Sequence, residues 1–217
     1  MNVSPSKENM LKRIRKALSH PTPLPFPQSE GNQSLLKEPS DDLAVEFAGR
    51  FTGLQGKFVF CSDASDCSQQ LKGLFESRKW EKVVCREPVF QQLIQKTQPS
   101  INFHNDLASS QVSVTGCDAL VARTGTVVLT SSAESGRTTS VYAPVHICIA
   151  FTNQLVYDVR DALIHLKEQY GTALPSMISF ATGPSRTADI EKTLVVGVHG
   201  PGEVFVFLID ASASVSR

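Results

Sequence analysis

The chain has 217 residues, a formal net charge of zero at pH 7 and a hydrophobic content of 41%. A chain of this length can bury about 70% of its unfolded surface in one core, so one main domain is expected. The balanced charge excludes the excess of Lys and Arg that binds a nucleic-acid backbone, and no apolar run approaches the ~20 residues that span a bilayer. The N-terminus lacks the apolar core of a secretory signal, which predicts a cytoplasmic location.

The first predicted element is a helix over residues 4–18, followed by a linker. Apolar side chains recur at helical spacing and form one stripe, made by Met10, Leu11, Ile14 and Leu18. Four prolines between residues 20 and 33 remove backbone donors and favour an extended chain. We therefore divide the chain into a helical arm with its linker, residues 1–38, and a main domain, residues 39–217.

In the main domain the predicted strands and helices alternate along the chain. Helices are expected over residues 42–51, 65–78, 88–96 and 156–170, a helical turn over 117–122, and strands over 57–61, 82–85, 112–115, 126–131, 146–151, 177–182 and 203–210. Such alternation indicates an α/β fold with a Rossmann-like, parallel-rich sheet and helices on both faces.

The cysteines and histidines predict no metal or cluster site in this chain. Five cysteines are scattered without a CxxC pair, which is not the close grouping that an iron–sulfur cluster needs, and an odd count argues against a disulfide framework. Cys61, Cys85 and Cys148 lie in or beside apolar strands and are expected to be buried. The histidines form no HExxH pattern, so a protein-only zinc site is not expected.

The first candidate segment for chemistry covers residues 122–140. It combines Gly125, which permits a tight turn, with a loop rich in hydroxyls after a buried strand. In open α/β sheets ligands bind at the carboxyl ends of strands, and a planar guanidinium suits a carboxylate or phosphate. The predicted anion-binding residues are Thr124, Gly125, Ser135, Gly136 and Arg137, with Glu134 as a candidate base. The alternative is an ordinary turn with a solvated arginine.

The second candidate segment, residues 179–193, follows a predicted strand. Ser185 or Thr187 can cap a helix here, and the N-terminus of a helix stabilises anions. The predicted binding residues are Gly183, Ser185, Arg186 and Asp189, although Asp189 has an alternative role in pairing with Arg186 or capping the turn. The segment matches neither a P-loop nor GxGxxG, so no nucleotide is inferred.

The third candidate segment, residues 195–207, surrounds His199 with three glycines just before the last strand. Histidine titrates near neutral pH and can act as a general base, so His199 is a candidate catalytic residue and Gly200 a candidate ligand contact. A structural histidine is the alternative. His146, which opens another strand, is expected to be a satisfied and partly buried histidine.

Three strings together resemble the LUD-domain family of the lactate-utilisation, or YkgG-like, type: DALVARTGTVVLTS (118–131), SGRTTSVYAPVHICIA (135–150) and GPSRTADIEKTLVVGVHGPGEVFVFLID (183–210). The resemblance implies a fold similar to the NagB/RpiA/CoA-transferase-like group. It also implies membership of a three-component system that oxidises L-lactate to pyruvate, in which the two partner components carry iron–sulfur clusters and this one carries no redox cofactor. It supplies no catalytic residues.

The sequence is compatible with three functions. The first is a component of the lactate-oxidising system that binds a small anionic substrate, with a homo-oligomer left open. The second is a stand-alone isomerase-like or transferase-like enzyme on a small phosphorylated or acyl substrate, which would rest on fold analogy. The third is a scaffold without a ligand. The site hypothesis requires that the three segments converge at one rim of the sheet in a pocket that Arg137, Arg186 and His199 share.

Overall fold

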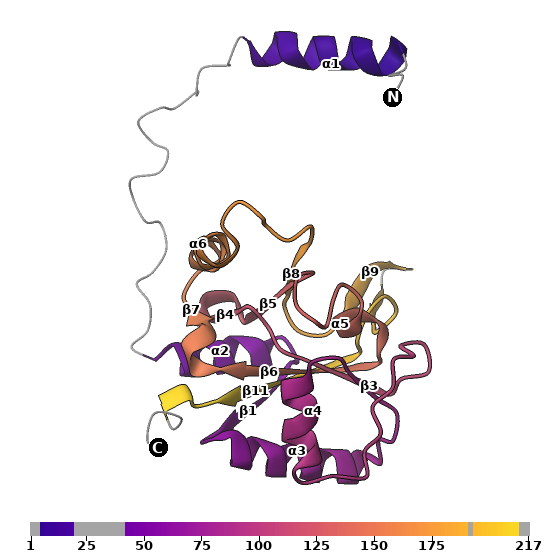
Figure 1. Ribbon diagram of the computed structural model, residues 1–217, viewed down its shortest axis with the longest axis vertical. Helices are drawn as coiled ribbons and strands as arrows, with labels where there is room; N and C mark the ends of the chain where they lie inside the picture. The colour runs from indigo at the N-terminus through magenta and orange to yellow at the C-terminus, as the bar shows by residue number, and fades with distance from the viewer. Residues whose placement is uncertain (1–4, 20–41, 191–192, 213–217) are drawn as a thin grey trace. The chain divides into compact units, whose positions relative to one another are not determined.

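The computed structural model describes residues 5–19, 42–190 and 193–212 (Figure 1). The chain divides into two compact units, residues 1–38 and 39–217. In the first unit, helix α1 (Pro5–Leu18) confirms the predicted helix, and its apolar stripe is exposed at Met10, Leu11, Ile14 and Leu18. The predicted proline linker lies outside the described residues. No helix within the described ranges is long and apolar enough to cross a bilayer.

The main unit is built on a five-stranded parallel sheet. Its strands are β1 (Lys57–Cys61), β2 (Val83–Cys85), β3 (Val112–Thr115), β6 (Val145–Phe151) and β11 (Glu203–Ile209). They lie in the order β1-β11-β6-β3-β2, and every neighbouring pair runs parallel. The two longest strands, β6 and β11, therefore occupy the centre of the sheet, where both faces are covered.

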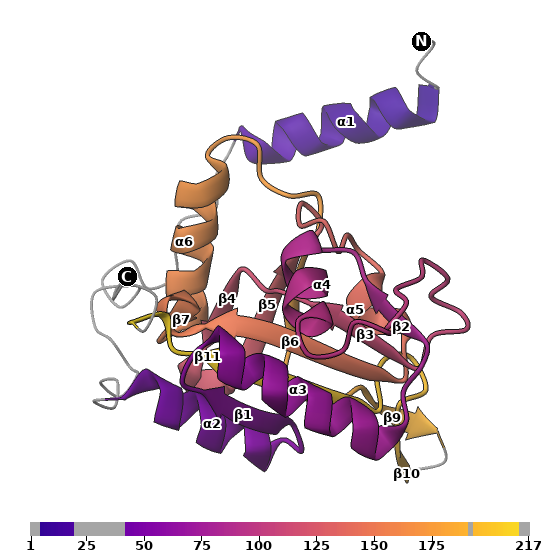
Figure 2. The ribbon, with the colours of Figure 1, turned by 60° about the horizontal axis from the view of Figure 1, so that its bottom comes forward.

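Helices α3 (Ala64–Arg78) and α4 (Pro88–Gln95) cover one face of this sheet, as Figure 2 shows. Their inward side chains, including Leu71, Phe75 and Ile94, pack against alternate residues of the strands, including Ile147 and Phe207. Side chains on a strand alternate between its faces, so the intervening residues of β6 and β11 point to the opposite layer.

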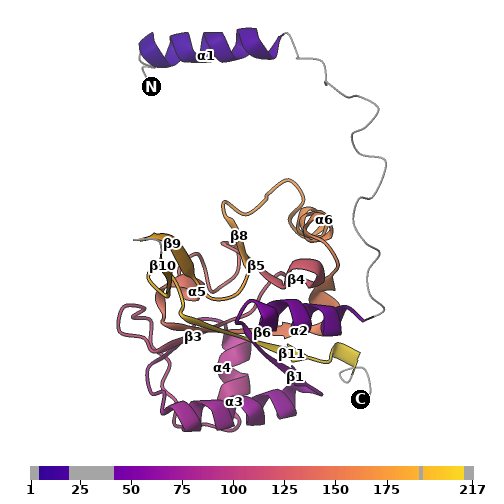
Figure 3. The same cartoon turned by 180° about the vertical axis from the view of Figure 1, so that it is seen from behind.

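Helix α2 (Leu43–Gly53) and a second sheet cover the opposite face (Figure 3). The second sheet has the order β7-β4-β5-β8, from β4 (Ala119–Val121), β5 (Thr126–Thr130), β7 (Leu155–Val156) and β8 (Ile178–Ala181). Helix α6 (Val159–Tyr170) packs on its outer side through Ala162 and Leu166. The predicted α/β fold with a parallel-rich sheet and helices on both faces is confirmed. The structure adds the second sheet, which lies between the parallel sheet and helix α6.

Two local predictions in this region are wrong. Residues 117–122, expected as a helical turn, form strand β4 and the start of the 3-10 turn Ala122–Thr124, because Leu120 and its neighbours are buried between the second sheet and its covering layers. Residues 186–190, expected as a helix, form strand β9 (Arg186–Ile190), which pairs antiparallel with β10 (Thr193–Val196). Because residues 186–190 form a strand, they offer no helix N-terminus that could bind an anion.

Candidate functional site

A cavity of about 280 Å³ lies between the two sheets, where β6 and β11 begin. The parallel sheet contributes His146 and Val204, and the second sheet contributes Leu129 of β5 and Ser179 of β8. The rim is made by the short helix α5 (Thr139–Tyr142) and by the loops at residues 182–185 and 199–201. The cavity is therefore lined by elements that are distant in sequence but held together by the two packed sheets.

Two of the predicted segments do converge at this cavity. The backbone N–H of Ser185 donates to the carbonyl of Pro201 at 2.9 Å, and the N–H of Gly197 donates to the carbonyl of Ser185 at 2.9 Å. A Cβ atom at Gly200 would lie 2.9 Å from the Cβ of Ser185, so only glycine fits this approach. Gly183, Ser185, His199 and Gly200 thus line one cavity, as the sequence hypothesis requires for these four residues.

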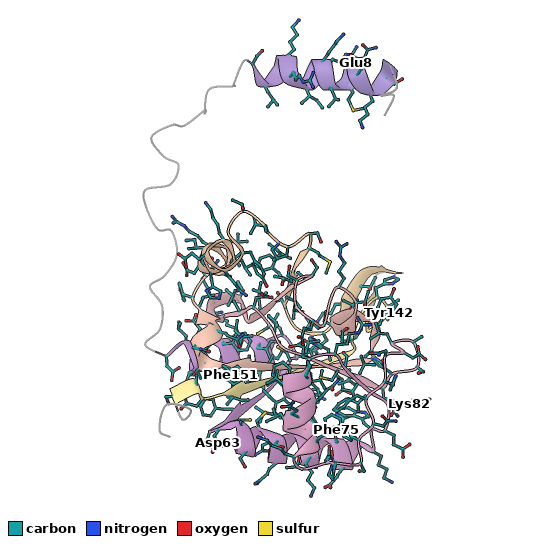
Figure 4. All side chains as sticks on the ribbon, viewed as in Figure 1. Glu8, Asp63, Phe75, Lys82, Tyr142 and Phe151 are labelled. Atoms are coloured by element: carbon teal, nitrogen blue, oxygen red, sulfur yellow. The ribbon has the colours of Figure 1, made fainter. Side chains whose placement is uncertain are left out.

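His199 marks the boundary between this cavity and a second, more open hollow of about 480 Å³. The side chain of His199 is exposed, and Val141, His199 and Gly200 line both spaces. The outer hollow has an apolar lip that includes the exposed side chains of Tyr142 and Val198. Tyr142 is the last residue of α5, and Figure 4 labels it on the opposite side of the main unit from Phe151, which ends β6.

His146 forms part of the cavity wall, which the sequence interpretation did not anticipate. It is 1% exposed, and its Nε2 lies 2.8 Å from the Oγ1 of Thr115. Burial removes the imidazole from water and lowers its pKa to about 4, so the ring is neutral at physiological pH. The signal available in the sequence was the alternation along β6, which sends His146 to the same side as Cys148, toward the second sheet.

The first half of segment 122–140 lies at a different place. Thr124 exchanges a hydrogen bond with Thr126 at 2.7 Å, and Thr126 does so with Thr182 at 2.9 Å. Gly125 has a φ of +61°, and a Cβ there would lie 2.6 Å from the backbone nitrogen of Phe51. Gly125 is therefore required for the packing of this turn against helix α2, and neither Thr124 nor Gly125 lines the cavity.

The second half of that segment packs over the carboxyl ends of β2 and β3. Ser135 is buried, and its carbonyl accepts hydrogen bonds from Thr139 at 2.6 Å and from Arg86 at 3.4 Å. Glu87 accepts from the N–H of Gly116 at 2.9 Å, and burial raises the pKa of its carboxyl above the ordinary value. The neighbouring residues Gly136 and Glu134 belong to this same turn, with Glu134 exposed to solvent.

The two arginines of the hypothesis lie apart from the cavity. Arg137 donates to the hydroxyl of Ser176, and Arg186 donates to the carbonyl of Leu54 and to the side chain of Gln55. Neither arginine is among the described residues that line the cavity, so the expected shared pocket of Arg137, Arg186 and His199 is not formed. Asp189 lies in β9, but its side chain falls outside the described part of the structure.

The position of the cavity also differs from the expected carboxyl rim. The loop that carries His199 leads into β11, so it must lie at the amino end of that strand. Strand β5, whose carboxyl end leads into the hydroxyl-rich loop, belongs to the second sheet and runs antiparallel to both of its neighbours. The cavity at His199 therefore lies outside the rule for ligands at the carboxyl ends of parallel strands, whereas the loop after β5 packs over the carboxyl ends of β2 and β3 without following either strand.

The cavity presents imidazole and hydroxyl groups, and no lysine or arginine lines it within the described residues. Its polar wall is formed by Ser140, His146, Ser179, Thr182, Ser185 and His199. The rest of the wall is apolar, and hydroxyls both donate and accept hydrogen bonds, so the lining suits a small molecule with an apolar part and a few polar atoms. Among the described residues there is no group of three His, Cys, Asp or Glu side chains that could hold a metal ion, and Cys61, Cys85 and Cys148 are free and buried.

The fold and this cavity define an α/β protein of two packed sheets with a small cavity between them, whose mainly apolar wall bears several hydroxyls and two imidazoles. The chain belongs to the LUD domain family, whose model matches residues 46–209. It is similar to lactate utilization protein C of Shouchella clausii, with 36% identity over 124 residues, which cover 52% of this chain and 54% of that protein. A lactate utilization protein C from a Geobacillus species is 44% identical over 94 residues, which cover 42% of this chain and 39% of that protein.

These matches span about half of the relatives' own length or less. A solved structure shares the fold, that of a DUF162 family protein from Deinococcus radiodurans, with a TM-score of 0.56 at 18% identity. The likeness covers 77% of this chain and 96% of that one. It supports the architecture described above, and the family assignment rests on the sequence match.

Proposed function

We propose that this chain is a cytoplasmic component of a system that oxidises L-lactate to pyruvate, and that it binds the small acid in the cavity between its sheets. Two kinds of observation support the proposal. Relatives with 36% and 44% identity carry the name lactate utilization protein C. The cavity that carries the argument has about 280 Å³ and a mainly apolar wall that bears hydroxyls and imidazoles, which suits a hydroxy acid of six heavy atoms with a methyl group.

The electrons in this proposal leave through partner proteins. Oxidation of a 2-hydroxy acid to a 2-oxo acid removes two electrons and two protons, and redox cofactors carry such chemistry. We propose that this chain binds no redox cofactor of its own and that two iron–sulfur proteins accept the electrons. The helical arm supplies a contact for them, because α1 exposes an apolar stripe at Met10, Ile14 and Leu18 beside basic residues in its last turn.

The lining of the cavity does not support a stand-alone isomerase. Such an enzyme would place a carboxylate base at the site, and Glu134 is exposed on a turn that does not line the cavity. Lactate and a sugar phosphate are both anions, so the lack of arginine and lysine in the described wall does not separate these two substrates.

The test is lactate oxidation by the reconstituted system with and without this chain. Ser179 lies in the cavity wall on β8, so Ser179→Leu fills the cavity with a bulky side chain. We expect lactate-dependent reduction of the iron–sulfur partners to need this chain and to be lost with Ser179→Leu. Ser176→Leu is the matched control, because Ser176 is exposed just before the same strand.

Three outcomes separate the functions. Oxidation that proceeds at the full rate without the chain rejects the proposal. Oxidation that needs the chain but tolerates Ser179→Leu makes it a scaffold without a ligand. Loss with both variants at equal stability would place the defect outside the cavity and would contradict the cavity as the binding site.

A further inference from the structure

The hydrogen bonds around His146 fix which nitrogen of its ring carries the proton. The hydroxyl of Thr115 lies 2.9 Å from the carbonyl of Gly116 and 2.8 Å from Nε2 of His146. A carbonyl can only accept, and a hydroxyl has one proton. Both contacts are hydrogen bonds at once only if Thr115 donates to Gly116 and the ring donates its Nε2–H to Thr115. The neutral ring is therefore protonated on Nε2.

The other ring nitrogen, Nδ1, is then an acceptor with a lone pair. Within the described part of the chain, the contact to Thr115 is the hydrogen bond that the side chain of His146 makes, and Nδ1 has no partner. The ring is 1% exposed and lines the cavity. Nδ1 is not among the fully buried unpartnered atoms of the described residues, so it is accessible from the cavity and can accept a hydrogen bond from a ligand that brings a donor. Because burial keeps the pKa of this histidine at about 4, Nδ1 stays unprotonated near neutral pH.

The other polar residues of the cavity wall do not require a hydrogen-bond donor from the ligand. Ser140, Ser179 and Ser185 line the cavity with hydroxyls, which rotate to donate or to accept as a ligand requires. His199 lies at the exposed mouth and can adapt through solvent. Nδ1 of His146 is thus the fixed acceptor in a cavity of otherwise adaptable groups.

We propose that His146 is a specificity-determining residue that selects 2-hydroxy acids over 2-oxo acids by accepting a hydrogen bond from the ligand's hydroxyl. The proposal rests on the proposed function and names the form of the substrate that the cavity holds. A 2-hydroxy acid presents an O–H donor to Nδ1. A 2-oxo acid presents carbonyl lone pairs, which repel the lone pair of Nδ1. The cavity would therefore hold the reduced acid and release the oxidised one.

The first experiment needs no variant. Calorimetric titration of the full chain with L-lactate, pyruvate and propanoate compares ligands that share a carboxylate and a three-carbon skeleton. One neutral hydrogen bond at a buried acceptor corresponds to about a tenfold difference in affinity. We expect L-lactate to bind at least about tenfold more tightly than either of the other acids. Equal affinity for lactate and pyruvate, or tighter binding of pyruvate, overturns the proposal.

Two substitutions then separate the two nitrogens. His146→Gln can keep a donor toward Thr115 but removes the acceptor at the Nδ1 position, whereas His146→Asn keeps an acceptor near Nδ1 and loses the contact with Thr115. We expect the affinity ratio of lactate to pyruvate to fall toward one in His146→Gln and to persist in His146→Asn. An unchanged ratio in His146→Gln contradicts the role of Nδ1.

The protonation state is measured directly on the wild-type chain. Long-range proton–nitrogen NMR of the imidazole distinguishes a ring protonated on Nε2 from one protonated on Nδ1. We expect the Nε2–H form in the free protein and a perturbed Nδ1 resonance when lactate binds. An Nδ1–H ring, or a charged one at neutral pH, overturns the proposal.

Failure here is distinguishable from failure of the proposed function. If the titrations show no binding or no preference while the reconstituted oxidation still requires this chain, the function stands and the role of His146 is rejected. If the oxidation does not require the chain but lactate binds with the expected preference, the reverse holds.

Discussion

Two stretches, residues 122–138 as the first segment and residues 183–202 as the second, both combine glycines with serine and threonine, yet the structure uses them differently. In the first, the polar groups bond within the protein: Thr124 bonds Thr126, and the carbonyl of Ser135 accepts from Thr139. In the second, the backbones of the two loops are hydrogen-bonded to each other, and residues beside that contact, including Ser185, line the cavity.

A segment that combines glycine with serine and threonine therefore predicts that its backbone comes close to another part of the protein. The composition does not predict whether a ligand site lies beside that contact. Gly125 brings its turn against the start of the last turn of helix α2. Gly200 brings its loop against Ser185, and a cavity remains beside that contact. Both segments satisfy the same sequence pattern, so only the surrounding layers decide whether a ligand can enter.

The largest expected effect comes from Gly125→Ala. A Cβ at this position would lie 2.6 Å from the backbone nitrogen of Phe51, and φ is +61°. Backbone cannot move aside as a side-chain tip can, and a left-handed conformation adds about 1–2 kcal/mol for a residue with a Cβ. We expect a loss of about 3–5 kcal/mol in the free energy of unfolding, measured by urea denaturation.

The matched control is Gly49→Ala in the middle of helix α2, where nothing lies within 4 Å of the added Cβ. Alanine is the better helix former, so the variant should be neutral or more stable by about 0.5–1 kcal/mol. Comparable stability of both variants would show that the turn at Gly125 is not packed as described. Reduced lactate affinity in a folded Gly125→Ala protein would assign the first segment to the ligand site.

The fold of residues 42–115 could be predicted from the sequence because each element there has a strong local signal. Apolar side chains recur with helical spacing in α3 and α4, and Asp42 caps α2 by accepting from the N–H of Ala44 at 2.8 Å. Such signals depend on neighbours within one or two turns, so they survive without knowledge of the tertiary structure.

The second sheet could not be predicted in the same way. Strand β4 has three residues, too few to show a period, and Ser185 just before β9 and Thr187 within it also fit a helix cap. The convergence of Ser185, His199 and Gly200 was predictable from their glycines. The role of His146 was not, because alternation along β6 identifies the face of a residue but not the gap between the layers it faces.

The next prediction concerns the pH dependence of stability that His146 in the cavity wall causes. The folded protein holds His146 with a pKa of about 4, whereas an unfolded histidine titrates near 6.5. Between these values the unfolded state binds the extra proton, so stability is present above about pH 6.5 and is lost as the pH falls toward 4. We expect this residue to contribute a loss of about 2–3 kcal/mol between about pH 7 and pH 4.5, measured as the difference between wild type and His146→Gln.

His165→Gln is the control for that series, because His165 is exposed on α6 and does not line the cavity. Its stability should follow the wild-type dependence on pH. If His146→Gln also follows it, the histidine is hydrated in the folded protein, and the cavity wall is less enclosed than its burial indicates.

The smallest effects separate the two arginines. Arg186 donates to a main-chain carbonyl at the end of α2, so Arg186→Ala should cost about 1–2 kcal/mol of stability in urea denaturation. Arg137 bonds an exposed serine hydroxyl, so Arg137→Ala should cost less than about 0.5 kcal/mol. Neither residue lines the cavity, and we expect both variants to bind L-lactate with wild-type affinity in calorimetric titration. A tenfold weakening in Arg137→Ala alone would mean that the loop of the first segment closes over the ligand, and the two segments would then form one site after all.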